Sequence, residues 1–157
     1  MRHALIALAA VAGLACSSGW AKDDKLDSVM ILKGTCTKLV LQGKDRSGDC
    51  INKVFNTAYR SGRTGFYFTT EDGAVVTFSG MGTQQIKIDE NSAVSPVDML
   101  IVGLGPNNND KLKAVGTCRY SNPYKGPSPV ACHAETTFGS YDASFTSDGS
   151  EPDLKKF

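Results

Sequence analysis

Four cysteines constrain this chain more than any other feature of its sequence. Gly34-Thr35-Cys36 is followed by thirteen residues and Cys50, and Gly116-Thr117-Cys118 is followed by thirteen residues and Cys132. The sequence has five cysteines, and removal of an export signal that includes Cys16 would leave these four, an even number that indicates disulfides in an exported chain. Of the three possible pairings, only Cys36 with Cys50 and Cys118 with Cys132 treats the two units alike. Zinc ligands usually come as pairs about two to four residues apart, so we expect no metal site here.

The repeated cysteine spacing is accompanied by a second similarity between the two parts of the chain. Phe68-Thr69-Thr70-Glu71-Asp72-Gly73 is echoed by Phe145-Thr146-Ser147-Asp148-Gly149. We therefore expect residues 22–157 to form a single β-rich domain made of two related halves, about 28–80 and 97–149. Residues 150–157 are expected to form a flexible tail.

The first residues have the pattern of an export signal. Arg2 precedes an apolar stretch from Ala4 to Leu14, and the small residues Gly19 and Ala21 stand where a signal peptidase cleaves. We expect residues 1–21 to be a signal peptide and the mature protein to be periplasmic or secreted. The alternative is a lipoprotein anchored through Cys16. No later stretch is long and apolar enough for a transmembrane helix.

Alternating apolar residues predict antiparallel strands. The run from Leu112 to Tyr120 and the run from Val130 to Phe138 each alternate, with the cysteines on the apolar face. They predict a hairpin with its disulfide near the loop, and residues 36–50 are expected to form its counterpart. Asp72-Gly73 predicts a two-residue turn between strands 66–71 and 74–79. The apolar run 97–102 predicts a strand buried on both faces.

These segments, with a short strand near Ile86 and Ile88, add up to about eight strands. The expected fold class is all-β, a small antiparallel barrel or two-sheet sandwich with two hairpin disulfides. The alternative is an α+β domain with a helix near residues 51–59, where apolar residues also fit a helical spacing.

Charge excludes one class of partner. Without Arg2 the chain has 17 − 1 = 16 lysines and arginines against 16 acidic residues, so nucleic acid is not an expected partner. Residues 33–63 are nevertheless basic and residues 64–110 acidic. This separation favours either two solvated faces or a basic surface that meets an acidic partner.

The expected hairpin loops carry the candidate binding residues. Lys44 and Arg46 lie in one loop, while Tyr120 and Tyr124 belong to the other. Tyrosine and arginine are common interface anchors, and a disulfide-supported loop loses little entropy on binding. Arg119 and His133 complete the candidate set.

The leading functional hypothesis is a non-enzymatic exported binding module that needs no cofactor. Its partner would be an envelope protein or a cell-wall component. One alternative is a structural or envelope-stress protein with no discrete site. The other is an enzyme that uses Arg119, His133 and Glu135, although no catalytic motif accompanies these residues.

Overall fold

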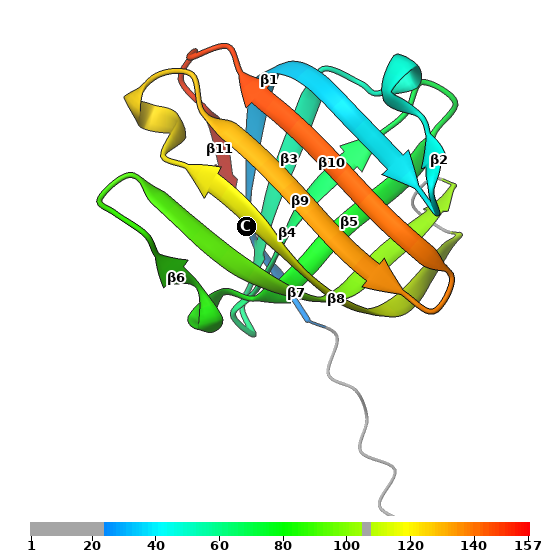
Figure 1. Cartoon of the computed structure of the whole chain (residues 1–157). Helices are drawn as coiled ribbons and strands as arrows, with labels where there is room; N and C mark the ends of the chain where they lie inside the picture. The colour runs from blue at the N-terminus through cyan, green and yellow to red at the C-terminus, as the bar shows by residue number, and fades with distance from the viewer. Residues whose placement is uncertain (1–23, 105–107) are drawn as a thin grey trace, which may run out of the picture.

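The protein is an antiparallel β-barrel with very little helix. The computed structural model describes residues 24–104 and 108–157, so the predicted signal peptide and Cys16 lie outside the described residues. Eight strands pair in the order β10-β9-β8-β7-β5-β4-β3-β1, and β1 pairs with β10 to close the barrel (Figure 1). Their bounds are β1 Leu26–Leu41, β3 Lys53–Tyr59, β4 Arg63–Thr69, β5 Ala74–Met81, β7 Ser92–Leu104, β8 Asn109–Ser121, β9 Pro129–Thr136 and β10 Gly139–Ser147. The all-β barrel prediction is confirmed, and residues 53–59 form a strand rather than the alternative helix.

Short elements decorate the barrel. They are the strands β2 Lys44–Asp45, β6 Ile86–Lys87 and β11 Asp153–Lys156, and the 3₁₀ turns η1 Ser47–Asp49, η2 Gly82–Gln84 and η3 Pro123–Lys125. β11 pairs antiparallel with the first part of β1, from Ser28 to Ile31. Residues 153–156 of the tail expected to be flexible therefore form a paired strand, along the part of this side of β1 that β10 does not cover; β3 pairs with the other side.

The barrel interior is a packed core. Its inward-facing side chains are fully buried, among them Leu39, Phe68, Phe78, Leu100, Tyr141 and Phe145. Phe68 and Phe78 meet edge to face, with ring centroids 5.9 Å apart and ring planes at 84°. Small barrels of eight strands have interiors that side chains can fill, and this one is filled.

The second cysteine pair lies in the predicted hairpin. Cys118 and Cys132 are direct partners on β8 and β9, and their disulfide faces the core. Buried and exposed residues alternate along both strands as predicted, and Val130 and Ala134 are buried on the same face as Cys132. Phe138 is the exception, since β9 ends at Thr136 and Phe138 lies in the following turn with 64% of its surface exposed.

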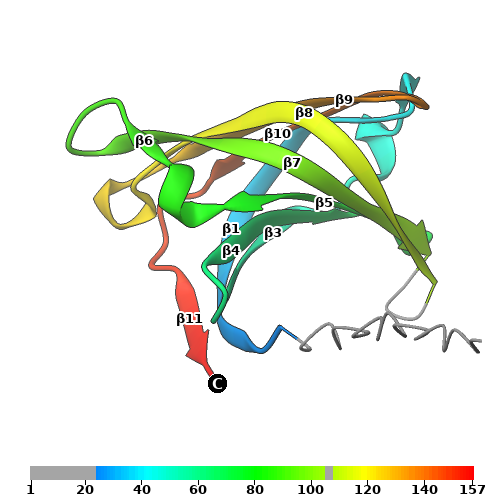
Figure 2. The same cartoon turned by 90° about the horizontal axis from the view of Figure 1, so that it is seen from below.

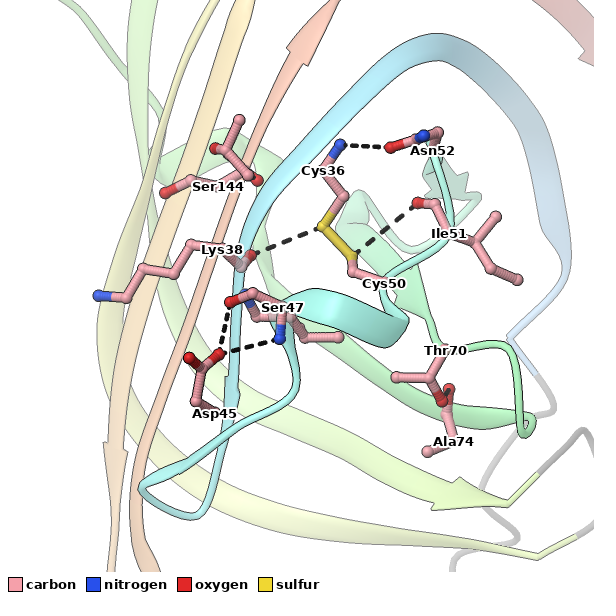
Figure 3. The surroundings of a disulfide bond; sticks show 12 residues. Cys36, Lys38, Asp45, Ser47, Cys50, Ile51, Asn52, Thr70, Ala74 and Ser144 are labelled. Carbon is pink, nitrogen blue, oxygen red and sulfur yellow. Dashed lines mark hydrogen bonds between the residues drawn. A yellow bond between two sulfur atoms is a disulfide. The ribbon is translucent and has the colours of Figure 1, made fainter.

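The first cysteine pair differs from its predicted form. Cys36 and Cys50 are disulfide-bonded as expected, but the hairpin expected between them is limited to the two-residue strand β2, which pairs with Val40 and Leu41 at the end of β1. The backbone of Cys50 instead forms an isolated antiparallel β-bridge with that of Thr70, the residue after the end of β4; Figure 3 shows both residues. Asn52 fixes this connection, because its side-chain oxygen accepts a hydrogen bond from the Cys36 N–H at 2.9 Å. One disulfide thus links adjacent strands and the other links a strand to a loop, so the expected duplication is not evident in the fold.

One local feature is nevertheless common to both Gly-Thr-Cys units. A Cβ atom on Gly116 would lie 2.0 Å from the carbonyl oxygen of His133, and one on Gly34 would lie 2.0 Å from that of Thr146. In both units the neighbouring backbone approaches so closely that only glycine fits.

The β4–β5 turn is one residue longer than expected. Thr70 and Ala74 are bonded across it, which leaves three residues in the loop, and of these only Gly73 has a positive φ, 87°. Three-residue hairpin loops of this kind have a single left-handed residue, usually glycine. The Asp72 carboxylate accepts hydrogen bonds from the Thr70 hydroxyl and the Ala74 N–H, and so holds the longer loop.

Burial on two faces occurs in β5 and not, as expected, in β7. Residues Ala74 to Gly80 are all buried, whereas in β7 Asp98 is exposed and the outward Met99 and Ile101 are half-buried. The ribbons of β3, β4, β5 and β7 curve together in Figure 2, so that this part of the outer surface is concave. Side chains from neighbouring strands cover the outer face of β5.

Candidate functional site

The concave outer surface contains two adjoining hollow features. One cavity of about 540 Å³ crosses β3, β4, β5, β7 and the start of β8. A more open region of about 770 Å³ continues it over β8 and the end of β9, and the two share Arg63, Met99 and Lys111. We call the combined feature the outer groove. Its main lining residues are Thr57, Tyr59, Arg63, Tyr67, Thr77, Ser79, Asp98, Met99, Ile101, Lys111, Lys113, Val115 and Glu135, with Asp24 at one end.

Strand alternation explains why these side chains meet. Phe66, Phe68, Val76 and Phe78 point into the core, so the residues between them point outward into the groove. Gly65 supplies no side chain at the centre of this face, and a Cβ there would lie 2.8 Å from Thr77 Cγ2. The floor is consequently made of small hydroxyl residues, with Thr77 6% and Ser79 3% exposed.

An ion pair crosses the groove. Arg63 Nη1 lies 2.7 Å from Asp98 Oδ1, and Nη2 donates to Oδ2 at 3.3 Å. Arg63 Nη1 also donates to the hydroxyl of Ser79 at 3.3 Å. Paired N–H groups on a planar guanidinium fix its orientation as well as its position. The groove therefore presents an arginine and a carboxylate in one held arrangement.

Tyr67 forms an aromatic wall next to this ion pair. Its ring packs edge to face on Phe55, with centroids 5.8 Å apart and planes at 86°. Burial raises the pKa of the Tyr67 phenol above its ordinary value. The phenol is thus neutral at physiological pH, and it can both donate and accept a hydrogen bond.

Lys44 and Arg46 lie together at one edge of the barrel. Arg46 Nε donates to Asp49 at 3.0 Å, and Nη2 donates to Asp72 at 2.8 Å. These hydrogen bonds, that of Asp49 first, raise the pKa of Arg46. Arg46 therefore braces its own loop against the β4–β5 turn, while Lys44 is exposed.

The tyrosines expected in the other loop have different surroundings. Tyr120 points inward, with its ring 5.0 Å from that of Phe66 and its hydroxyl 3.0 Å from Ser95 Oγ. Tyr124 is 50% exposed on η3, where its N–H donates to the Asn122 side chain. η1 and η3 lie on opposite sides of the molecule in both views (Figures 1 and 2), so the two loops do not form one surface.

His133 lies on the outside of β9 between two carboxylates. Its Nδ1 is 3.0 Å from Asp142 Oδ1 and its Nε2 is 3.2 Å from Glu135 Oε1. Asp142 also pairs with Lys38 at 3.5 Å, and it was not among the sequence candidates. Arg119 lies on the neighbouring strand opposite Ala131. Within the described part of the chain, no group of His, Cys, Asp and Glu side chains is arranged to hold a metal ion.

Sequence reasoning missed the outer groove, although one signal was present. Asp98 interrupts the apolar run 97–102, and a charge inside such a run indicates either an edge or a partner. Its partner Arg63 lies 35 residues away. Ion pairs also explain part of the charge separation along the chain. The basic segment 33–63 pairs with the acidic segment 64–110 through Arg46 with Asp72 and through Arg63 with Asp98.

Comparison with protein-family models, curated proteins and solved structures gave no match to this chain. Of the residues that the structure describes, no helix has the length and hydropathy needed to cross a bilayer. The outer groove has to be interpreted from its own chemistry.

Proposed function

We propose that this chain is an exported, non-enzymatic binding module that holds its ligand in the outer groove. The carrying observation is the preformed arrangement of Arg63 and Asp98 beside Tyr67, above a floor of buried hydroxyl groups. Ligand sites are typically concave, with apolar and aromatic walls and a few placed polar groups, and their volumes are about 300–1,000 Å³. Both sections of the outer groove are in this range.

The two disulfides support the exported part of the proposal. A small β fold with formed disulfides is compatible with an oxidising compartment outside the cytoplasm. The expected signal peptide points to the periplasm or the extracellular medium. The ligand would then be an envelope or cell-wall component, or a molecule that reaches the same compartment.

A binding role is favoured over catalysis by the engagement of the groove hydroxyls. Ser79 Oγ donates to the carbonyl of Thr64 at 3.1 Å, and the base candidate His133 contacts carboxylates on β9 and β10 instead. A nucleophilic hydroxyl needs a general base within hydrogen-bond reach. In the described groove lining, no hydroxyl is paired with such a base.

Tyr124 supports a second candidate surface. It is a half-exposed aromatic residue on a short turn held by Asn122, close to the Cys118–Cys132 hairpin. Exposed tyrosines on rigid supports are frequent anchors for protein partners. This surface would use the disulfide-supported loop that the sequence indicated, without Lys44 and Arg46.

A fragment screen by NMR tests the groove directly. The mature, oxidised, ¹⁵N-labelled protein is exposed to a chemically diverse small-molecule library, and shifts are mapped to the sequence. We expect hits to cluster on the amides of Tyr67, Ile101 and Lys111. Clustering around Tyr124 would favour the second surface, and scattered shifts or none would contradict the proposal.

Two matched variants control this screen. Met99→Trp places a large ring in the groove and should abolish the hits. Val94→Trp makes the same change at another outward-facing, half-buried position of β7, away from the groove lining, and should retain them.

A further inference from the structure

We infer that the outer groove takes a neutral oligosaccharide, a ligand with many hydroxyl groups and no net charge. This inference rests on the proposed function and assigns a chemical class to its ligand. It follows from the charge balance of the groove, from the pairing of the strands that line it, and from the mixture of flat apolar and polar groups on its walls.

The charges that line the groove cancel. Three cations face it, Arg63, Lys111 and Lys113, and three carboxylates accompany them, Asp24, Asp98 and Glu135. Each carboxylate has a partner on the protein. Asp98 forms an ion pair with Arg63. Asp24 accepts a hydrogen bond from the Ser61 hydroxyl. Glu135 Oε1 lies 3.2 Å from His133 Nε2. A ligand with a net charge would exclude water from the groove and leave an excess of one sign of charge buried there without a partner. A neutral ligand would leave the charges of the groove balanced.

The groove is unsuited to a peptide bound as an added strand. Peptides that bind to sheets usually pair with the free backbone groups of an edge strand. The groove lies on the face of the sheet, and β4, β5 and β8 are each paired with a strand on both sides. Recognition must therefore come from side chains, which suits a ligand whose polar groups project all around it.

The lining offers side-chain donors and acceptors that remain free. Arg63 has five N–H groups and makes three hydrogen bonds in the described structure, which leaves two donors. Asp98 is half exposed and retains acceptor capacity, and the Tyr67 hydroxyl is a neutral donor and acceptor. Such groups match the alternating hydroxyls of a sugar ring.

The apolar part of the lining matches the other character of sugars. Tyr67 on β4 and Met99 and Ile101 on β7 supply apolar surface on the two sides of the Thr77 and Ser79 floor. The C–H face of a pyranose can cover this surface while its hydroxyls reach Arg63 and Asp98. A purely aliphatic ligand would instead cover these charged groups without hydrogen-bonding them, which is costly. The length of the groove, with two connected sections, fits several sugar units better than one.

The test compares trisaccharides that differ in charge. The neutral probes are triacetylchitotriose, cellotriose and maltotriose, the acidic probe is a trimer of galacturonic acid, and the basic probe is the chitosan trimer. Each is titrated into the mature, oxidised protein, and binding is followed by calorimetry and by amide shifts. We expect at least one neutral trimer to bind and to shift Tyr67 and Ile101.

Variants separate the groove from other surfaces. Met99→Trp should abolish binding and Val94→Trp should preserve it. Asp98→Asn should weaken binding by roughly tenfold or more, as expected for the loss of a charged hydrogen-bonding group. Lys125→Gln, at an exposed site outside the groove, should leave the affinity unchanged, and melting curves confirm that each variant is folded.

The outcomes distinguish this inference from the proposal beneath it. Equal or tighter binding of a charged trimer would refute the charge argument. If fragments bind in the groove but no neutral trimer does, the ligand class is wrong and the groove remains a binding site. If neither fragments nor trimers bind there, both are wrong.

Discussion

Removing each disulfide in turn tests how the two cysteine pairs stabilise the barrel. The change is Cys118→Ala with Cys132→Ala in one variant, and Cys36→Ala with Cys50→Ala in the other. Both bridges join residues 14 positions apart. The loop entropy that each removes from the unfolded chain is therefore the same, and for loops of this size it is about 3 kcal/mol.

The folded structure makes the two losses unequal. Cys118 and Cys132 are 1% and 4% exposed within the core, whereas Cys50 is only half-buried at the barrel edge. Removing two fully buried sulfur atoms leaves a void, which adds about 1–2 kcal/mol. We expect the Cys118/Cys132 variant to lose about 4–5 kcal/mol in free energy of unfolding, and the Cys36/Cys50 variant about 3–4 kcal/mol.

Urea denaturation followed by tyrosine fluorescence measures both losses. The midpoint and slope of each transition give the free energy of unfolding in water. A larger loss in the Cys36/Cys50 variant would refute the argument from core burial. Losses below about 1 kcal/mol in both would refute the argument from loop entropy.

The same reasoning applies to the fully reduced protein. Two bridges together contribute about 6 kcal/mol, comparable with the whole stability of a typical domain, about 5–15 kcal/mol. Reduction with dithiothreitol should therefore unfold a large part of the population at 37 °C. Such dependence is what a protein made for an oxidising compartment would show.

Three other predictions follow from the fold. Gly116→Ala should destabilise the barrel by roughly 2 kcal/mol in urea denaturation, because its Cβ would meet the His133 carbonyl, while Gly48→Ala, where the space is open, should be neutral. Hydrogen bonds from the Thr70 hydroxyl, and next from Arg46, lower the pKa of Asp72 from 3.8 to about 2. The ionised Asp72 carboxylate therefore stabilises the folded protein fully above pH 3.8, and this contribution is lost as the pH falls through 2. Melting temperatures of Asp72→Asn should accordingly change less over that range than those of the parent protein. Deleting residues 153–157 should remove hydrogen-exchange protection from those β1 amides between 28 and 31 that bond to β11 rather than to β3, and unchanged protection of these amides would show that β11 is not needed there.

Local sequence patterns predicted the second hairpin because its interactions are local. Alternation in β8 and β9 places Cys118 opposite Cys132 across a short connection, and no distant residue is needed to decide it. The all-β class and the outward position of His133 follow from the same pattern, whereas the cysteine pairing was inferred from the repeated spacing, and it is correct although the fold shows no duplication. In the first unit the neighbour of β1 is β10, more than a hundred residues later, so no local pattern could show that Cys50 would turn toward Thr70.

The candidate site was harder to predict for the same reason. The outer groove depends on the curvature of four strands and on a glycine, Gly65, that leaves space at its centre. Strand alternation shows which residues point outward but not whether the outer face is convex or concave. Tyr120 illustrates the opposite case, since its position near a loop suggested exposure while the period of its strand placed it in the core.

The closure of the barrel by its first and last strands also determines when the chain can fold. β1 pairs with β10 through Gly34 and Ser147, and with β11 through Ser28 and Lys156. At a synthesis rate of about 5–20 residues per second, β1 waits roughly 6–26 s for these partners. During that time β1 can pair with β3, but the side that joins β10 and β11 has no partner, so the barrel stays open. If the chain is exported as proposed, a delay of this length gives the translocation machinery time to engage it before it becomes too compact to thread.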